Sequence, residues 1–369
     1  MGSGAREDRV RRAEADVRAQ IAGLVIAGAG MAGLAAAVRA RELGAKPVVL
    51  EKGDRPGGSM LLSSGVVWRH RTFDGFRAEC PGGDPALQQA IVERLDEAIG
   101  WLESLGAPVL EHETGNPRTI GKRFDTRGLT ETLVSRAGDV QVGQVLVPGT
   151  GPWPEGPMIL ATGGFHVRLA SDLGLPIRGN PWSVGDGLDL ALERGGETTR
   201  GLEEFYGRAM PAGIPIDEAE FVPLSQLYGR FAEVVSEDGM QRFEGEVSWS
   251  ETNLVQAIAR WPGGRAWYRV HESRLGQRVR ERTVADMIEH ARAAGAVVRE
   301  EPPFTSVLVQ ASVTQTLGGV RIDERARVVG AENLFAAGAD TGGIATGGYS
   351  SGLAAGLVFG RIAAEEALS

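Results

Sequence analysis

The chain has 369 residues, which suits two domains better than a single core. Its net charge of −9 is spread without long acidic or basic blocks, which argues against nucleic acid or an anionic membrane surface as a partner. One cysteine, Cys80, excludes a disulfide framework, and no apolar run approaches the ~20 residues of a membrane span. Residues 1–20 are highly charged and lack the apolar segment of a secretory signal, so we predict an N-terminal helix or tail and a cytoplasmic location.

The first regular pattern is a βαβ unit within residues 21–78. The apolar run Leu24–Ala27 predicts a strand, and Pro47–Leu50 predicts a second strand that ends at Glu51. Between them, a helix of small residues follows three glycines with the spacing of a dinucleotide-binding turn: Gly28, Gly30 and Gly33. The strand before the turn, the helix after it and the acid at the second strand end together predict a nucleotide site.

Each part of this turn has a physical task in nucleotide binding. Gly28 permits the tight turn, Gly30 lets the backbone approach a pyrophosphate, and Gly33 lets the helix pack on the strand. The N–H groups and the positive dipole end of the helix at Met31–Ala32 suit phosphates. Glu51 lies where an acid accepts hydrogen bonds from ribose hydroxyls. The turn alone does not separate NAD from FAD.

Apolar periodicity predicts further helices and strands along the chain. Within Pro85–Leu105, one helical stripe contains Leu87, Ile91, Leu95, Ile99 and Leu102. The other predicted helices are Leu129–Ala137, Gly185–Arg194, Thr283–Ala294 and Leu353–Ala367, and the other predicted strands are Met158–Leu160, Gly319–Ile322 and Asn333–Ala337. Residues 138–157 are rich in Gly and Pro and predict a loop with room for one strand.

The βαβ pattern stops near residue 200, where Tyr and Trp become more frequent. We therefore predict a separate mixed domain over residues 200–311. Strand and Gly-rich turn patterns return in residues 312–368, so the nucleotide-binding domain is predicted to be discontinuous, with its first part in residues 21–199. The predicted fold class is α/β, with an inserted α+β domain.

Three Gly-rich clusters lie downstream of the βαβ unit. Gly57–Ser59 follows the second strand and lets the backbone pass close to a phosphate or ribityl chain. Ala161–Gly164 follows the strand Met158–Leu160, where a tight turn approaches the adenosine side. Asp340 ends the third cluster, and its carboxylate is placed to hold ribityl hydroxyls. The helix that begins near Ser351 directs its N-terminus toward an electron-rich ring edge.

The order of these motifs, GAGMAGL, EKGDRPGGS, ATGGF, GDG, TLGGVRID and LFAAGAD, resembles FAD-dependent oxidoreductases of the fumarate reductase/succinate dehydrogenase flavoprotein class, which includes 3-ketosteroid and tricarballylate dehydrogenases. The resemblance covers most of residues 21–368. It implies FAD as cofactor, a Rossmann-like FAD-binding domain and a mobile capping domain, here residues 200–311, over the flavin. The candidate FAD-binding residues are Gly28, Gly30, Met31, Ala32, Gly33, Glu51, Lys52, Gly58, Ser59, Ser63, Ser64, Gly65, Ala161, Thr162, Gly163, Asp340, Ser351, Gly352 and Leu353.

The loop before the last helix departs from the fumarate-reducing members of this class. Ala345 stands where their His would be, Tyr349 stands where their Arg would be, and Gln315 replaces a second His. An Arg pairs a carboxylate through two hydrogen bonds, which a Tyr cannot do. The dicarboxylate clamp is therefore not visible in this sequence, and a fumarate reductase is disfavoured.

Tyr349 resembles instead the Tyr before the last helix in ketosteroid dehydrogenases, where a phenol and a backbone N–H polarise the substrate carbonyl. Hydride removal from the carbon β to a carbonyl is easier when the α proton leaves with enolate character, and hydrogen-bond donors stabilise that oxyanion. Tyr206, in the segment Glu204–Gly207, resembles a substrate-facing residue of the tricarballylate branch. We take Tyr349 and Tyr206 as the candidate catalytic residues, with Tyr206 as proton acceptor or second donor.

These features predict an FAD-dependent oxidoreductase that introduces or reduces a C–C double bond adjacent to a carbonyl in a small-molecule substrate, with hydride exchanged with flavin N5. One alternative is a fumarate reductase-like reductase of an unsaturated carboxylic acid, with Arg208 or Arg269 in place of the missing clamp. Another is a non-catalytic flavin-binding relative that acts as a partner subunit, suggested by the shortened regions 138–157 and 297–304. No spacing of His, Asp or Glu indicates a metal, and the motifs specify neither the electron acceptor nor the oligomeric state.

Overall fold

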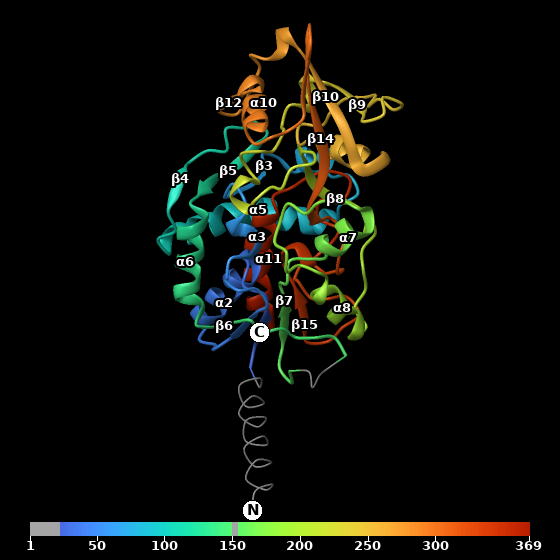
Figure 1. Cartoon of the computed structure of the whole chain (residues 1–369). Helices are drawn as coiled ribbons and strands as arrows, with labels where there is room; N and C mark the ends of the chain where they lie inside the picture. Colours follow the sequence, from blue (N-terminus) through green and yellow to red (C-terminus); the bar gives the residue numbers. More distant parts are fainter. Residues whose placement is uncertain (1–22, 150–153) are drawn as a thin grey trace, which may run out of the picture.

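The computed structural model describes residues 23–149 and 154–369, and a five-stranded parallel sheet lies at its centre (Figure 1). The strand order is β15-β7-β1-β2-β6. The strand bounds are β1 Val25–Ala27, β2 Val48–Glu51, β6 Asp139–Val142, β7 Met158–Leu160 and β15 Leu334–Ala336. All neighbouring strands run parallel, so their carboxyl ends share one edge of the sheet, where α/β proteins bind nucleotides.

Two helices pack closely against each other beside this sheet. α2, Met31–Glu42, connects β1 to β2, and α11, Gly352–Ala367, follows β15 near the C-terminus. A Cβ atom at Gly360 would lie 2.3 Å from the carbonyl oxygen of Ala32, so only glycine allows this approach. Both helices are buried along most of their length, which explains why apolar and small residues occupy nearly all of their faces.

The rest of this half of the molecule surrounds the sheet and the two helices. α5, Pro85–Ser104, packs against α11, and α6, Thr126–Ala137, packs against α2. Asp84 and Asp125 cap α5 and α6 by accepting hydrogen bonds from backbone N–H groups in the first turns. The remaining elements are α3 Gly58–Leu61, α4 Phe73–Glu79, α7 His166–Leu173, α8 Asp186–Glu193, the 3-10 helix η5 Gly338–Asp340 and a sheet of β3 Val66–His70, β5 Thr119–Phe124 and β4 Val109–Glu111. We call residues 23–149, 154–204 and 317–369 the base.

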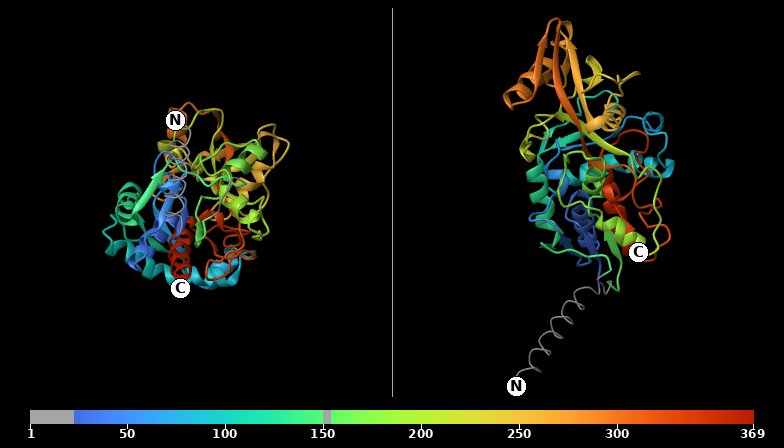
Figure 2. Two further views of the ribbon diagram at one scale, coloured as in Figure 1. Left: turned by 90° about the horizontal axis from the view of Figure 1, so that it is seen from below. Right: turned by 45° about the vertical axis from the view of Figure 1, so that its right-hand side comes forward.

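Residues 205–316, which we call the cap, form an antiparallel sheet that projects from the base (Figures 1 and 2). The order is β13-β14-β10-β9, and β8 pairs with the C-terminal part of β14. The bounds are β8 Phe205–Pro211, β9 Glu233–Ser236, β10 Arg265–His271, β11 Arg278–Val279, β12 Arg282–Thr283, β13 Val298–Glu301, β14 Phe304–Thr316, α9 Thr252–Ala259, α10 Val284–Ala293, η1 Glu218–Glu220, η2 Gly229–Phe231, η3 Pro262–Gly264 and η4 Glu272–Arg274. The long strand β14 returns the chain to the base, and the boundary predicted at residue 311 falls inside it.

The parallel sheet with its helices and the mixed cap confirm the predicted α/β fold class. The predicted strand Gly319–Ile322 is wrong, because this segment makes only isolated bridges, such as the one between Ile322 and Val328. Gly319 packs against other backbone, since a Cβ there would lie 2.4 Å from the carbonyl oxygen of Asp340. Residues 138–157 do contribute one strand, β6. The helix or tail predicted for residues 1–20 lies outside the described residues.

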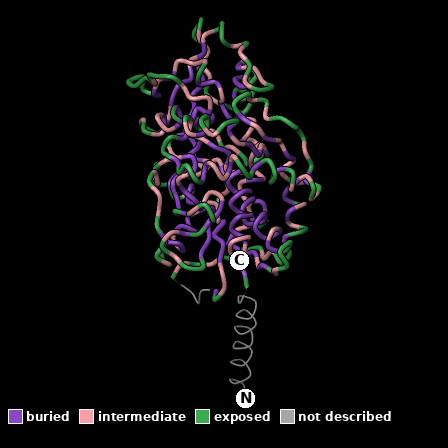
Figure 3. Tube along the Cα trace, turned by 180° about the vertical axis from the view of Figure 1, so that it is seen from behind, coloured by how far each residue is buried: buried purple, intermediate pink, exposed green. Residues whose placement is uncertain are grey.

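Buried positions run through the base and into the cap (Figure 3). The main cluster of buried apolar side chains includes residues of both, and a small second cluster around Trp267 lies in the cap. The cap sheet therefore shares its core with the base rather than standing apart from it. Within residues 23–149 and 154–369, no helix has both the length and the apolar character needed to cross a bilayer.

Candidate active site

The turn between β1 and α2 shows which glycines the protein needs for its own packing. Gly28 has a φ of +103°, and a Cβ there would lie 2.2 Å from the carbonyl oxygen of Ala161. A Cβ at Gly33 would lie 1.9 Å from the carbonyl oxygen of Gly28. A Cβ at Gly30 would be 4.0 Å from its nearest neighbour, the carbonyl oxygen of Gly57. The space at Gly30 is thus left for a ligand at the N-terminus of α2, which no side chain caps.

The carboxylate of Glu51 is buried at the end of β2 and holds the same turn. Its Oε2 accepts a hydrogen bond from the N–H of Ala29 at 2.8 Å, and its Oε1 accepts one from the N–H of Gly53 at 2.6 Å. Each oxygen has a second lone pair, so the group can still accept ribose hydroxyls. It lines a cavity together with Ala27, Gly28, Leu50, Lys52, Gln144, Val145, Leu146, Thr162, Trp182, Asp186 and Leu190. Its wall offers apolar side chains together with the carboxylate of Glu51 and the Lys52–Asp186 ion pair, a combination that suits an adenosine.

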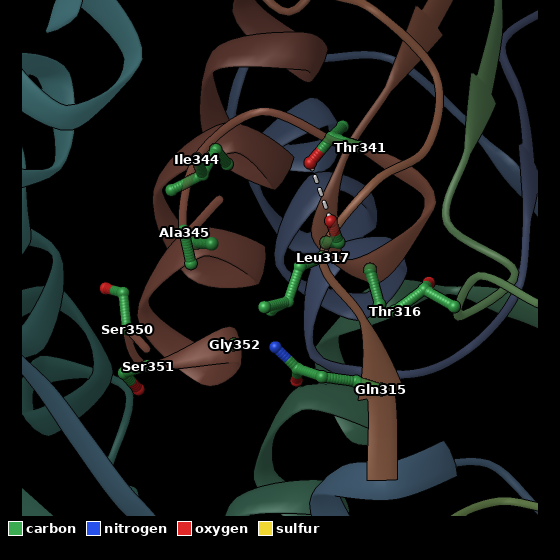
Figure 4. A pocket seen from close by; sticks show the side chains of 12 residues that line it. Gln315, Thr316, Leu317, Thr341, Ile344, Ala345, Ser350, Ser351 and Gly352 are labelled. Carbon is green, nitrogen blue, oxygen red and sulfur yellow. Dashed lines mark hydrogen bonds between the residues drawn. The ribbon is translucent and has the colours of Figure 1, made fainter. Parts of the chain in front are cut away.

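A second cavity lies at the N-terminus of α11 (Figure 4). Its lining residues are Gln315, Thr316, Leu317, Gly338, Ala339, Thr341, Ile344, Ala345, Ser350, Ser351, Gly352 and Ala355. The hydroxyls of Ser350 and Thr316 are buried there and have no hydrogen-bond partner in the described part of the chain. Ser351 caps α11 by accepting a hydrogen bond from the N–H of Ala354 at 3.2 Å. Unpaired buried hydroxyls on a wall of mixed polar and apolar residues suit a flat ring system with polar edges.

Asp340 fixes the backbone between the two cavities. Its Oδ1 accepts hydrogen bonds from the hydroxyl of Thr162 and the N–H of Gly164, both at 2.8 Å, and its Oδ2 accepts one from the N–H of Thr162 at 2.5 Å. Burial raises the pKa of the Asp340 carboxyl, and these hydrogen bonds oppose the shift. Thr162 lines the first cavity, and the neighbouring Ala339 lines the second. The carboxylate itself lies on neither wall, so its part is to hold the backbone that separates the two cavities.

Comparison with known proteins agrees with this geometry. A family model described as "FAD binding domain" matches residues 23–150 and 155–353, which is most of the chain. The chain belongs to the FAD binding domain family. A curated relative, a fumarate reductase (cytochrome) from Shewanella frigidimarina, is 24% identical over 449 residues, covering 93% of this chain and 76% of the relative.

Two solved structures show the fold of this FAD binding domain protein. The open conformation of a flavocytochrome c3 fumarate reductase has a TM-score of 0.69 at 22% identity and covers 98% of this chain and 80% of that chain. A 3-ketosteroid-Δ4-(5α)-dehydrogenase from Rhodococcus jostii RHA1, in complex with 4-androstene-3,17-dione, has a TM-score of 0.67 at 18% identity, with coverages of 94% and 96%. The predicted family and cofactor are confirmed: the protein is an FAD-dependent oxidoreductase.

The residues present fit FAD along the path between the two cavities. When FAD is bound, the open face at Gly30 would hold the pyrophosphate, the Glu51 cavity would hold the adenosine, and the unpaired hydroxyls of Ser350 and Thr316 would lie toward the ring. Of the candidate FAD residues, those on a cavity wall are Gly28, Glu51, Lys52, Thr162, Ser351 and Gly352. Their assignment as FAD contacts stays a prediction, as it does for the other candidates.

Several other candidates bond to the protein's own backbone. The hydroxyl of Ser63 donates to the carbonyl oxygen of Met60 at 2.8 Å and accepts from the N–H of Gly65 at 3.1 Å. Gly65 has a φ of +73°, and a Cβ there would lie 2.2 Å from the carbonyl oxygen of Phe124. These contacts shape the loop between α3 and β3, so the side chains of this loop hold its form whether or not they touch a ligand.

The two candidate catalytic residues meet at the junction of cap and base. Tyr206 lies on β8 in the cap, and Tyr349 lies in the loop that leads into α11. Their rings stack with centroids 3.8 Å apart and planes inclined by 12°. Tyr206 pairs across the strands with Gln315, and Tyr349 precedes Ser350; both of these neighbours line the second cavity. The structure thus brings both tyrosines beside the cavity at the N-terminus of α11.

Aromatic side chains and one histidine hold the Tyr349 loop in place. The ring of Trp68 lies 5.5 Å from that of Tyr349, and the ring of Trp249, from the cap, lies 6.2 Å away. His70 donates from Nε2 to the carbonyl oxygen of Tyr349 at 3.3 Å. Burial lowers the pKa of His70 to about 4, which this hydrogen bond partly opposes, so the ring is neutral near pH 7. Neither the tryptophans nor His70 were expected here from the sequence.

Arg208 places a positive charge against the tyrosine pair. It lies two residues after Tyr206 on β8, with its guanidinium carbon 4.9 Å from the centroid of the Tyr206 ring. Its Nη1 donates to the carbonyl oxygen of Ser250 at 2.5 Å. Burial and the Tyr206 phenol raise the pKa of Tyr349, whereas Arg208 lowers it. The guanidinium therefore favours negative charge at this pair of phenols.

Arg178 is a second guanidinium in this region that sequence reasoning missed. Its Nε donates to the carbonyl oxygen of Phe221 at 2.8 Å and to the hydroxyl of Ser225 at 3.1 Å. Burial lowers the pKa of Arg178 to about 10, and the phenols of Tyr206 and Tyr349 oppose the shift. Among the described residues, neither Arg178 nor Arg208 has a carboxylate within ion-pair distance. No local motif marks Arg178, because the fold alone brings the segment before α8 against β14.

Arg269, the other arginine considered from the sequence, does not join this group. It lies on β10, where its Nη1 is 3.3 Å from Glu233 and its guanidinium carbon is 4.8 Å from the centroid of the Phe304 ring. Both partners belong to the cap sheet. Ala345 and Gln315 do line the second cavity, so the two positions at which this chain lacks the fumarate-type histidines are both part of the site.

Proposed function

We propose that the protein introduces or reduces a C–C double bond adjacent to a carbonyl group in a small-molecule substrate. The observation that carries this proposal is the stack of Tyr206 on Tyr349 beside the cavity at the N-terminus of α11. Two phenols and the adjacent guanidinium of Arg208 are suited to a carbonyl oxygen that gains negative charge.

Bound FAD supplies the hydride acceptor or donor, a chemistry that no side chain offers. The hydroxyl of Tyr349 donates a hydrogen bond to the substrate carbonyl, and a backbone N–H at the start of α11 acts as a second donor. In dehydrogenation Tyr206, as its phenolate, takes the proton from the carbon α to that carbonyl, and in reduction its phenol returns that proton and becomes the phenolate. Arg208, over the Tyr206 ring, stabilises the phenolate form.

The walls of the second cavity support an apolar or mixed substrate. Ala345 and Gln315 are uncharged and line the cavity, so its walls provide no clamp for a dicarboxylate. The 3-ketosteroid dehydrogenase of similar fold was solved with a steroid ketone, 4-androstene-3,17-dione. A cyclic ketone is therefore the first substrate class to test.

A second candidate function is the reduction of an unsaturated carboxylic acid, as the name of the Shewanella relative suggests. Arg208 and Arg178 favour it, because both lie near the tyrosine pair without a carboxylate partner among the described residues. A substrate carboxylate would supply the missing negative charge. Arg269 does not contribute in this scheme, since Glu233 already pairs with it.

An anaerobic substrate panel on FAD-replete protein separates the two functions. We expect 3-ketosteroids or related ketones to reduce the flavin, or their unsaturated forms to reoxidise the reduced flavin. Reoxidation by unsaturated acids alone would favour the second function. A flavin that responds to no member of the panel would overturn both.

The role of Tyr349 is tested by Tyr349→Phe, which keeps the ring stack and removes the donor. We expect the substrate-dependent flavin reduction rate to fall about 100-fold or more, the usual effect of losing one oxyanion donor. Flavin content and thermal stability, measured on the same samples, should match the unmodified protein. Unchanged turnover with full flavin content would contradict the role.

A further inference from the structure

A buried carboxylate in the cap has no part in the chemistry described so far. Glu251 precedes α9 with a φ of 58°, a left-handed conformation that is uncommon for a residue other than glycine. Glu251 is only 2% exposed, and its Oε1 makes no hydrogen bond in the described part of the chain. The nearest ion-pair contact is Nε of Arg230, at 4.0 Å. Burial of an ionised carboxylate with so little pairing costs free energy, so its retention calls for an explanation.

The titratable groups that interact with Glu251 lie on β8, on β10 and at η2. They are Arg208 on β8, Tyr268 on β10, and Tyr228 and Arg230 at η2. The hydroxyl of Tyr268 is also buried without a partner, whereas that of Tyr228 donates to Gln226 at 2.8 Å. Burial raises the pKa of Glu251 to about 7, and Arg208 and Arg230 oppose the shift. Glu251 is the one carboxylate in this set.

The loop that carries Glu251 also grips Arg208 and reaches the base. The carbonyl oxygen of Ser250 accepts the hydrogen bond from Nη1 of Arg208. The hydroxyl of the same Ser250 donates to Oε1 of Glu79, at the end of α4, at 3.2 Å. The guanidinium of Arg208 therefore contacts both the Tyr206 ring and the carbonyl of the Ser250–Glu251 peptide.

We propose that Glu251 is a positioning residue that sets the charge balance of the active site through Arg208. When Glu251 is ionised, its negative charge offsets the positive charge that Arg208 presents to Tyr206 and Tyr349. When Glu251 takes up a proton, Arg208 is left uncompensated and stabilises negative charge at the phenols and at the substrate oxygen more strongly. The inference rests on the proposed function of the tyrosine pair, but the coupling between Glu251 and Arg208 is measurable without any substrate.

The first experiment measures that coupling on FAD-replete protein labelled at the glutamate side-chain carboxyl carbon. NMR titration should show one glutamate with a midpoint near neutral pH, and this signal should be absent from Glu251→Gln. In Arg208→Gln the midpoint should rise by about one unit, because a neighbouring cation is lost. Arg269→Gln, which removes a cap arginine paired with Glu233, should leave it unchanged. A midpoint that ignores Arg208→Gln, or that moves equally in Arg269→Gln, would overturn the inference.

The second experiment compares substrate-dependent flavin reduction in the unmodified protein and Glu251→Gln across pH. The rate of the unmodified protein divided by that of Glu251→Gln removes the effect of groups that titrate in both proteins. This ratio should be close to one below the Glu251 midpoint and fall about tenfold above it, which corresponds to roughly one pKa unit of coupling. Glu233→Gln, which removes a surface partner of Arg242 and Arg269, should track the unmodified protein. A flat ratio would overturn the inference while leaving turnover intact. A substrate panel without any turnover would instead sink the proposed function, and the NMR coupling would still stand or fall by itself.

Discussion

The buried carboxylates of the base and of the cap are held in different ways. Glu51 and Asp340, in the base, accept hydrogen bonds at both of their oxygens, mostly from backbone N–H groups. Glu251, in the cap, also takes backbone hydrogen bonds, from Gly229 and Arg230, but it leaves Oε1 unpartnered beside arginines. The base therefore fixes both oxygens of each carboxylate through turns that follow strand ends. The cap leaves one oxygen of its carboxylate unpaired near positive charge, which suits a region where charge develops during a reaction.

The largest expected effect tests whether backbone packing rules the base. In Gly33→Ala the new Cβ meets the carbonyl oxygen of Gly28, so we expect the free energy of unfolding to drop by about 3 kcal/mol. Gly30→Ala is the matched control, because its Cβ meets no protein atom closer than 4.0 Å. It should keep the stability of the apoprotein and lose FAD affinity. Urea denaturation and flavin titration check this pair, and equal destabilisation by both changes would contradict the distinction.

Asp340→Asn should have the next largest effect. The amide –NH₂ then faces an N–H donor of Thr162 or Gly164, so a buried hydrogen bond becomes a clash of donors. We expect a loss of about 2 kcal/mol in the free energy of unfolding. Asp186→Asn, which removes a partly exposed ion pair with Lys52, should cost less than about 1 kcal/mol. If the two variants unfold alike in urea, Asp340 does not organise the backbone between the cavities.

The base could be predicted from the sequence because its constraints are local. Backbone atoms of a single turn and its neighbouring strand leave no room for a Cβ at Gly28 or Gly33, so the spacing of these glycines is visible in the sequence. The helix at Pro85–Leu105 and the strand at Met158–Leu160 were likewise set by periodicity. The exception, Gly319–Ile322, has a strand-like composition but lies beside loops that offer it no ladder.

The site at the junction of cap and base could be predicted only in part, because tertiary packing assembles it. A family resemblance predicted Tyr206 and Tyr349 as catalytic residues. Their stacking was not predictable, because it joins two segments that no local sequence pattern relates. Arg178, Trp249 and Glu251 carry no motif, since each gains its role from partners on another element. An isolated arginine or glutamate is expected to lie on the surface, and only the fold shows that Arg178 and Glu251 are buried.

The smallest expected effect gives the sharpest contrast with Asp340, because the same carboxylate-to-amide change should act in the opposite direction. The pKa of Glu251 is raised from 4.5 to about 7 by burial, so the folded state holds its proton more tightly than the unfolded state. The free energy of unfolding should then fall as pH rises from the pKa of Glu251 in the unfolded state to its pKa in the folded state, and it should stay lower at higher pH. Glu251→Gln removes this loss, so its free energy of unfolding should exceed that of the unmodified protein above neutral pH and match it in acid. Urea denaturation at both ends of that range checks the sign, with Glu233→Gln as the exposed control. Destabilisation by Glu251→Gln at alkaline pH would mean that the cap, like the base, depends on its carboxylate as a fixed hydrogen-bond acceptor.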